Sequence, residues 1–320
     1  MRKLALLLAV LVSSAALGQD WPARTVHVIV PYPTGGGHDF QSRLVAARLQ
    51  ESLKQTFVVE NRTGASGTIG TEYVVKSAPD GHTFVVASPA ETVVGPVAGL
   101  KMNYNWEKDL APVTVIGELP LAVTVHPSVP VKTIQELLAY AKKSPGKLSY
   151  ATPGSGSTMH FAGESLKAIA GLFIVHIPYR GAGPAVADLL GGQVPMGIMG
   201  TPPVVPPHKA GKLRILAVTG ARRSSALPDI PAMAELPGFA DYNFTNWTGV
   251  FVPAKTPPAV IARIAAEIGK VLKEPAVRER LAGAGVDALG LSTADTVKFF
   301  AREKETYARI AKARSIKADD

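Results

Sequence analysis

The sequence predicts an α/β protein of two domains, joined by two crossovers and separated by a central cleft. Short apolar runs alternate with amphipathic segments, a glycine-rich loop follows such a run in each half, and two further apolar runs connect the halves. We place domain 1 at residues 19–120 and 247–320 and domain 2 at residues 121–246, after a signal peptide at residues 1–18.

The signal peptide is predicted from the first residues. Arg2 and Lys3 precede an apolar run at 4–12, and small residues follow at 16–18. No later apolar run approaches the roughly 20 residues that a membrane-spanning helix needs. We therefore expect an exported and soluble protein, and we expect it to be a monomer. The chain has 0 cysteines, so its core and not disulfide bonds must stabilise it.

A formal charge of +9 raises the question of nucleic-acid binding. The lysines and arginines are scattered, and no aromatic residues alternate with them along a basic stripe. This pattern is typical of a generally basic surface and argues against a nucleic-acid partner.

The first half alternates strands and helices. Strands are expected at 25–30, 57–59 and 83–87, and helices at about 40–53 and 71–76. The loop PYPTGGGHDF at 31–40 joins the first strand to the first helix. Its glycines allow a turn that bulkier residues resist, and free N–H groups at a helix start suit a carboxylate or phosphate. The same glycines can equally serve a tight turn alone.

The second half repeats this arrangement. Strands are expected at 147–152, 173–176, 194–199 and 213–218, and helices at 131–144, 159–170 and 183–190. The loop Pro153-Gly154-Ser155-Gly156-Ser157 again lies between a strand and a helix. Two glycine-rich loops in two domains describe a cleft that can close on a small ligand.

The connections between the halves are apolar. The run at 111–125 is expected to form two strand segments joined by a bend at Pro120, and the run at 243–252 returns the chain to domain 1. Helices at 258–272, 275–284 and 293–313 complete that domain.

Signatures of enzymes are missing from the sequence. Neither glycine loop completes G-x-G-x-x-G, and there is no P-loop, no G-x-S-x-G and no H-E-x-x-H motif. We therefore expect no catalytic residues, no metal and no cofactor.

Several motifs, in order along the chain, resemble the Bug family. They include VIVPYPTGGGHD, VVENRTGASGTIG, YATPGSGSTMHFAGE, VHIPYRGAGPAVADLLGGQV and NWTGVFVPAKTP. Members of this family are periplasmic receptors of tripartite tricarboxylate transporters. The resemblance implies a Venus-flytrap fold of the periplasmic-binding-protein type, which binds a small carboxylate and presents it to membrane permease subunits.

The resemblance also implies the binding residues, which lie in the two glycine-rich loops and at the ends of nearby strands. They are Tyr32, Thr34, Gly35, Gly36, His38, Asp39, Ser88, Gly154, Ser155, Gly156, Ser157, Thr158 and Tyr179, supported by His160, Arg180 and Met199.

Two of these residues carry specific expectations. Asp39 would repel a carboxylate, so we expect it to cap the helix start and hold the loop. His38 can either donate to the anion, with charge near pH 6.5, or be an ordinary surface histidine. Whether His38 and Arg180 face the cleft is open, with solvent or the domain rim favoured for Arg180.

The chain departs from the family pattern where many members carry Phe-Asp-Asn. Here the residues are Ile198-Met199-Gly200, so an acceptor for amino or hydroxyl groups is lost. A less polar wall favours an aromatic or plain aliphatic carboxylate over an amino acid or citrate. Two alternatives to a role in transport remain open. One is a receptor coupled to a membrane sensor kinase, and the other, more remote, is an exported enzyme that uses the glycine loops.

Overall fold

The computed structural model describes residues 21–179, 181–314 and 316. Its strands form one sheet in the order β2-β1-β3-β9-β4-β7-β5-β6, and β8 and β10 also pair with β4. The predicted α/β class is confirmed. The expected signal peptide at 1–18 lies outside the described residues. Within the described residues, no helix is both long and apolar enough to cross a membrane.

The first half is built on three parallel strands, with β1 between the other two. Its strands are β1 (Val26–Val30), β2 (Phe57–Asn61) and β3 (Thr83–Ala87). Its helices are α2 (Gly37–Leu53), α3 (Thr68–Val75), α4 (Gly95–Val97) and α5 (Trp106–Asp109), with a 3-10 turn η1 (Ala65–Gly67) and a π-turn η2 (Ala90–Val94). Helix α2 begins at Gly37, three residues earlier than expected, so the last glycine of the loop belongs to its first turn.

The second half has β5 parallel to both β6 and β7. Its strands are β5 (Ser149–Thr152), β6 (Val175–Pro178), β7 (Met196–Gly200) and β8 (Arg214–Val218). Its helices are α6 (Ile134–Lys143), α7 (Thr158–Ala170), α8 (Ala182–Leu190) and α9 (Thr201–Lys209), with a 3-10 turn η3 (Met233–Glu235).

Helix α9 was not predicted, because four of its nine residues are prolines. Pro202 and Pro203 occupy the first turn, where a missing N–H breaks no helical hydrogen bond. Pro206 and Pro207 lie further inside the helix. The prolines therefore argued against a helix in the sequence, although two of them lie in the first turn, where a helix tolerates proline.

Two long strands connect the halves: β4 (Leu110–Val125) and β9 (Thr245–Pro253). Strand β4 is continuous, so the expected break at Pro120 is wrong. Instead β4 changes partners there: it pairs with β9 up to Pro120, and with β7 from Leu121. Pro120 is tolerated because it lies at the last position of the β9 ladder, where the loss of one donor costs little.

The strand directions make the two halves face each other. Strand β9 is antiparallel to both β3 and β4, so β1, β2 and β3 run in the same direction as β4, towards the second half. Strand β7 is antiparallel to β4, so β5, β6 and β7 run back towards the first half. The loops that follow both sets of strands therefore lie at facing edges of the sheet, across the middle of β4.

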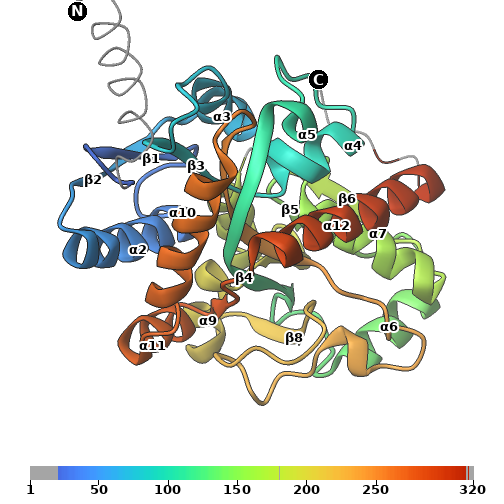
Figure 1. The fold of residues 1–320 in the computed structure, drawn as a ribbon. Coiled ribbons are helices and arrows are strands. Elements are labelled where there is room, and N and C mark those ends of the chain that lie inside the picture. Colours follow the sequence, from blue (N-terminus) through green and yellow to red (C-terminus); the bar gives the residue numbers. More distant parts are fainter. Residues whose placement is uncertain (1–20, 180, 315, 317–320) are drawn as a thin grey trace, which may run out of the picture.

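The chain ends by covering both halves with α10 (Pro258–Val271), α11 (Pro275–Gly283), β10 (Asp287–Ala288) and α12 (Thr293–Arg314). Helix α12 crosses β4 and reaches α7 (Figure 1). Its Phe300 packs 4.8 Å from the ring of Trp247 in β9, and its Tyr307 packs edge-on at 5.1 Å against Phe161 in α7.

Candidate ligand-binding site

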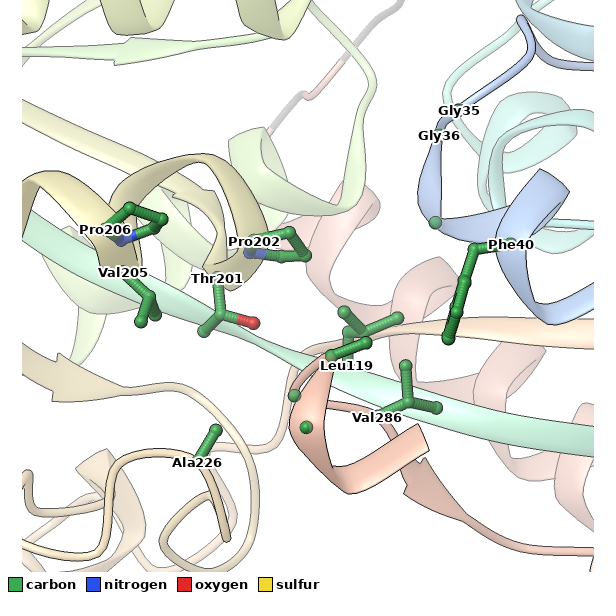
Figure 2. A pocket seen from close by; sticks show the side chains of 14 residues that line it. Gly35, Gly36, Phe40, Leu119, Thr201, Pro202, Val205, Pro206, Ala226 and Val286 are labelled. Carbon is green, nitrogen blue, oxygen red and sulfur yellow. The ribbon is translucent and has the colours of Figure 1, made fainter. Parts of the chain in front are cut away.

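A cavity of about 320 Å³ lies where the facing edges meet (Figure 2). It draws its walls from the start of α2, the middle of β4, the start of α9, and the segment between α11 and β10. The lining residues are Gly35, Gly36, Gly37, Phe40, Leu119, Thr201, Pro202, Val205, Pro206, Ala226, Gly283, Ala284, Gly285 and Val286. None of these described lining residues carries a charge.

The first glycine loop is held by Asp39, which is only 2% exposed. Its Oδ2 accepts from the N–H of Gly35 at 2.9 Å, and its Oδ1 accepts from Asn61 Nδ2 at 2.9 Å. Arg43 Nε donates to both carboxylate oxygens at 3.0 Å. Burial acts to raise the pKa of Asp39, but these hydrogen bonds outweigh it and lower the pKa. The carboxylate therefore holds the loop as expected, but the expectation that it caps the helix is wrong, because the N-cap of α2 is Gly36 and no side chain caps it.

The free donors of this loop lie one residue later than expected. The N–H of Gly35 is taken by Asp39, and that of Gly36 donates to the carbonyl of Pro33 at 3.3 Å. Gly36 is the N-cap of α2 and has no side chain to satisfy the first turn. The N–H groups of Gly37 and His38 consequently have no acceptor inside the helix. Gly37 is among the residues that line the cavity, so its N–H and the positive end of the helix dipole are available there.

The hydroxyls of Tyr32 and Ser88 form hydrogen bonds to a residue of the first half, Glu91. Tyr32 Oη donates to Glu91 Oε2 at 2.6 Å, and Ser88 Oγ donates to the same oxygen at 2.6 Å. Glu91 is 0% exposed, and burial raises its pKa to about 7. The two hydroxyls thus satisfy a buried carboxyl beneath the loop. Thr34 Oγ1 donates to Asn61 Oδ1 at 3.1 Å.

His38 is neither a surface histidine nor a charged one. It is 8% exposed, its ring stacks on Tyr32 at 4.8 Å, and its Nδ1 lies 3.0 Å from Thr248 Oγ1. Burial lowers its pKa to about 4, so the ring is neutral at physiological pH. Its side chain ties α2 to β9, while its backbone N–H belongs to the free first turn.

The second glycine loop is also internally bonded. Ser157 caps α7: its Oγ accepts from His160 N at 3.3 Å and donates to Gly154 O at 2.7 Å. His160 Nδ1 accepts from Gly156 N at 3.1 Å, as expected of a residue that supports the loop. Thr158 is 4% exposed at the start of α7.

Residues 154–158, which include Ser155, are not among the described residues that line the cavity. The first turn of α7 nevertheless lies beside that of α9. A Cβ built on Gly200 would be 4.0 Å from Met159 Cε. The side chain of Met159 therefore reaches the start of α9, whereas no residue of the second loop lines the cavity.

Three further predicted residues lie away from the cavity or outside the described chain. Tyr179 Oη donates to Asp188 Oδ2 at 2.7 Å, which fixes it to α8. Met199 is 0% exposed and packs in the core of the second half. Arg180 lies outside the described residues.

Comparison with known proteins identifies the family. The model of the tripartite tricarboxylate transporter family receptors matches residues 41–316. The chain belongs to this receptor family. The resemblance to Bug proteins is confirmed as well: Protein BugT of Bordetella pertussis is 35% identical over 302 residues, which cover 94% of this receptor and 92% of BugT.

Solved structures agree with this assignment. R. palustris Rpa4515 with adipate has a TM-score of 0.83 and 34% identity, over 93% of this receptor and 99% of that chain. MatC from Rhodopseudomonas palustris with bound malate has a TM-score of 0.77 and 28% identity, over 91% and 99%. The periplasmic binding protein BugD has a TM-score of 0.76 and 28% identity, over 93% and 100%. The receptor thus has the expected periplasmic-binding-protein fold, and its family binds solutes and includes members with bound carboxylates.

Most of the receptor's cavity was missed from sequence. Phe40, Leu119 and Val286 carry apolar side chains that sequence alone cannot distinguish from core residues. Thr201 offered one signal of a binding position, because it directly follows the end of β7 as the first glycine loop follows the end of β1. Figure 2 shows its hydroxyl oxygen pointing into the space between the walls.

Proposed function

We propose that this receptor captures a small organic carboxylate in the cavity between its halves and delivers it to the membrane subunits of a tripartite tricarboxylate-type transporter. The observation that carries the proposal is the uncapped start of α2. Gly37, whose N–H has no helical acceptor, lies there in the lining of a cavity whose described residues include no charged side chain. Rpa4515 and MatC, with adipate and malate, support a carboxylate as the anion.

The carboxylate is held by backbone donors rather than by a cation. Hydrogen bonds to a charged group are roughly twice as strong as neutral ones, and the helix dipole adds about 0.3–1 kcal/mol or more where water is excluded. Backbone donors on a helix are already in place before the ligand arrives, so little ordering entropy is lost on binding.

We propose that the two halves are domains, at 19–120 with 247–320 and at 121–246, that close about the partner change of β4. Closure would bring the second loop at Gly154–Thr158 over the ligand from the other side. The facing strand directions support this, because they put both sets of loops at the same opening.

The walls indicate the kind of acid. Phe40, Leu119, Val205, Ala226 and Val286 present carbon to the cavity. Neither an ammonium group nor the additional carboxylates of citrate would find a charged partner among them. An aromatic or plain aliphatic acid is therefore the preferred ligand. The receptor binds this acid without chemical change, and it does so in the periplasm.

The test is to identify the acid and then measure its binding. Mass spectrometry of small molecules released from protein purified without denaturation should find an organic acid. A thermal-shift panel should show stabilisation by aromatic or aliphatic acids. Stabilisation by amino acids alone would contradict the ligand class, and turnover of a bound acid would contradict a receptor without catalysis.

A further inference from the structure

Thr201 presents to the cavity a buried hydroxyl that has no hydrogen-bond partner among the described residues. It is the first residue of α9 and is 1% exposed. Figure 2 shows the hydroxyl oxygen directed into the cavity, opposite Gly35 and Phe40. A buried hydroxyl without a partner is costly, so a ligand atom that bonds it would relieve that cost.

The start of α9 lacks the donors that α2 has. A helix normally exposes the N–H groups of its first turn, but here the second and third helical residues are Pro202 and Pro203, which have none. Thr201 is therefore the one residue of those three with an N–H or a side-chain hydroxyl. This wall cannot surround a carboxylate with donors in the way the α2 wall can.

The other side chains on this side of the cavity are apolar. They are those of Pro202, Val205, Pro206 and Ala226, and Thr201 Oγ1 is the only side-chain oxygen or nitrogen among the described lining residues. Gly285 leaves the space beside the hydroxyl open, since a Cβ at that position would lie 3.4 Å from Thr201 Oγ1. A second carboxylate would lose its hydration here and gain a single hydroxyl in return.

We propose that the ligand is a monocarboxylate whose apolar body carries one neutral oxygen at its far end, a hydroxyl or a carbonyl, and that Thr201 recognises that oxygen. This inference rests on the proposed carboxylate binding. The carboxylate lies at the start of α2, the hydrocarbon body crosses the cavity past Leu119, and the neutral oxygen exchanges a hydrogen bond with Thr201. Thr201 is thus the residue that selects among acids of equal length.

Matched acids that differ only at the far end test the inference. One set is hexanoate, 6-hydroxyhexanoate and adipate, and the other is 4-methylbenzoate, 4-hydroxybenzoate and terephthalate. Calorimetry with the wild-type receptor should give tightest binding for the hydroxy acid in the set that fits. The dicarboxylate should bind at least about tenfold more weakly than the hydroxy acid.

Two variants assign the preference to the hydroxyl. Thr201→Val keeps the shape and should weaken the hydroxy acid about tenfold while leaving the methyl acid unchanged. Thr201→Ser keeps the oxygen and should retain the preference. Because Thr201→Val removes an unpaired polar atom, the melting temperature of the ligand-free protein should stay the same or rise.

The outcomes separate the two proposals. Tightest binding of adipate or terephthalate by the wild type would overturn the role of Thr201 and leave carboxylate binding standing. Equal weakening of the hydroxy and methyl acids in Thr201→Val would do the same. If the mass-spectrometric search found no acid and none of the six bound, carboxylate binding itself would be overturned. The wild-type ranking needs no variant, so misfolding of Thr201→Val cannot obscure it.

Discussion

Replacing Gly37 by proline removes one donor from the anion site and nothing from the fold. Gly37 is the first residue of α2, where proline is well tolerated and its N–H has no helical acceptor. Gly36 before it has φ −74° and ψ 169°, the extended conformation that a residue preceding proline prefers. A Cβ at position 37 would meet no atom within 4 Å.

The expected effects on binding and stability have opposite signs. A hydrogen bond to a charged group contributes about 1.5–3 kcal/mol, and every 1.4 kcal/mol is tenfold in affinity, so Gly37→Pro should weaken carboxylate binding roughly 10- to 150-fold. The free energy of unfolding should stay level or rise by about 0.4–1 kcal/mol, because proline restricts the unfolded chain.

Calorimetry and chemical denaturation of the ligand-free protein measure these two quantities. Gly37→Ala is the matched control, since it adds a Cβ at the same place and keeps the N–H. If proline and alanine weaken binding equally, the loss is steric and the N–H of Gly37 is not a ligand donor. If Gly37→Pro binds as the wild type does, the carboxylate is held elsewhere and the proposed site is wrong.

Three further predictions concern titratable groups, two in the first glycine loop and one, Glu303, in α12. Asp39→Asn should cost about 1–3 kcal/mol of stability at pH 7 by weakening the hold on Gly35. Because the folded pKa of Asp39 is depressed, its contribution is lost as pH falls below 3.8, so denaturation curves of variant and wild type should converge there. Burial, together with neighbouring Glu118, raises the pKa of Glu303 from 4.5 to about 7, so its contribution is full below pH 4.5 and is lost as pH rises towards 7. In Glu303→Gln the amide oxygen can still accept from Trp247 but does not titrate. Between pH 4.5 and 7 the free energy of unfolding of the wild type should therefore fall by up to about 3 kcal/mol more than that of the variant. Equal pH dependence of the two free energies would refute this. The ring of His38 should show no NMR titration between pH 5.5 and 8, and a step near 6.5 would contradict its burial.

The fold was predictable because its signals are local and periodic. Apolar runs of strand length alternated with amphipathic segments, and the glycines of both loops marked strand-to-helix turns. The exceptions have physical reasons. Proline usually interrupts strands and helices, but Pro120 lies where β4 changes partners and Pro202 lies in a first turn, where each is tolerated.

The site was predictable only in part, because hydroxyls and glycines beside a helix start look alike whether they bind a ligand or each other. Ser157 caps its own helix and Tyr32 serves Glu91, and no sequence motif reveals those partners. The apolar residues that line the cavity come from segments far apart in the chain, such as Leu119 and Val286. Their common position follows from strand directions in the folded sheet, which residue patterns do not specify.

Those strand directions also explain why a ligand should couple the two halves. Helix α2 follows a strand that runs with β4, and α9 follows one that runs against it, so their first turns approach the cavity from opposite sides. An acid long enough to reach from Gly37 to Thr201 contacts both halves, whereas a shorter acid contacts only α2. Binding free energy can favour a closed form only through contacts made in that form and absent from the open one. We therefore expect ligand length, and not the carboxylate alone, to decide which acids close the receptor.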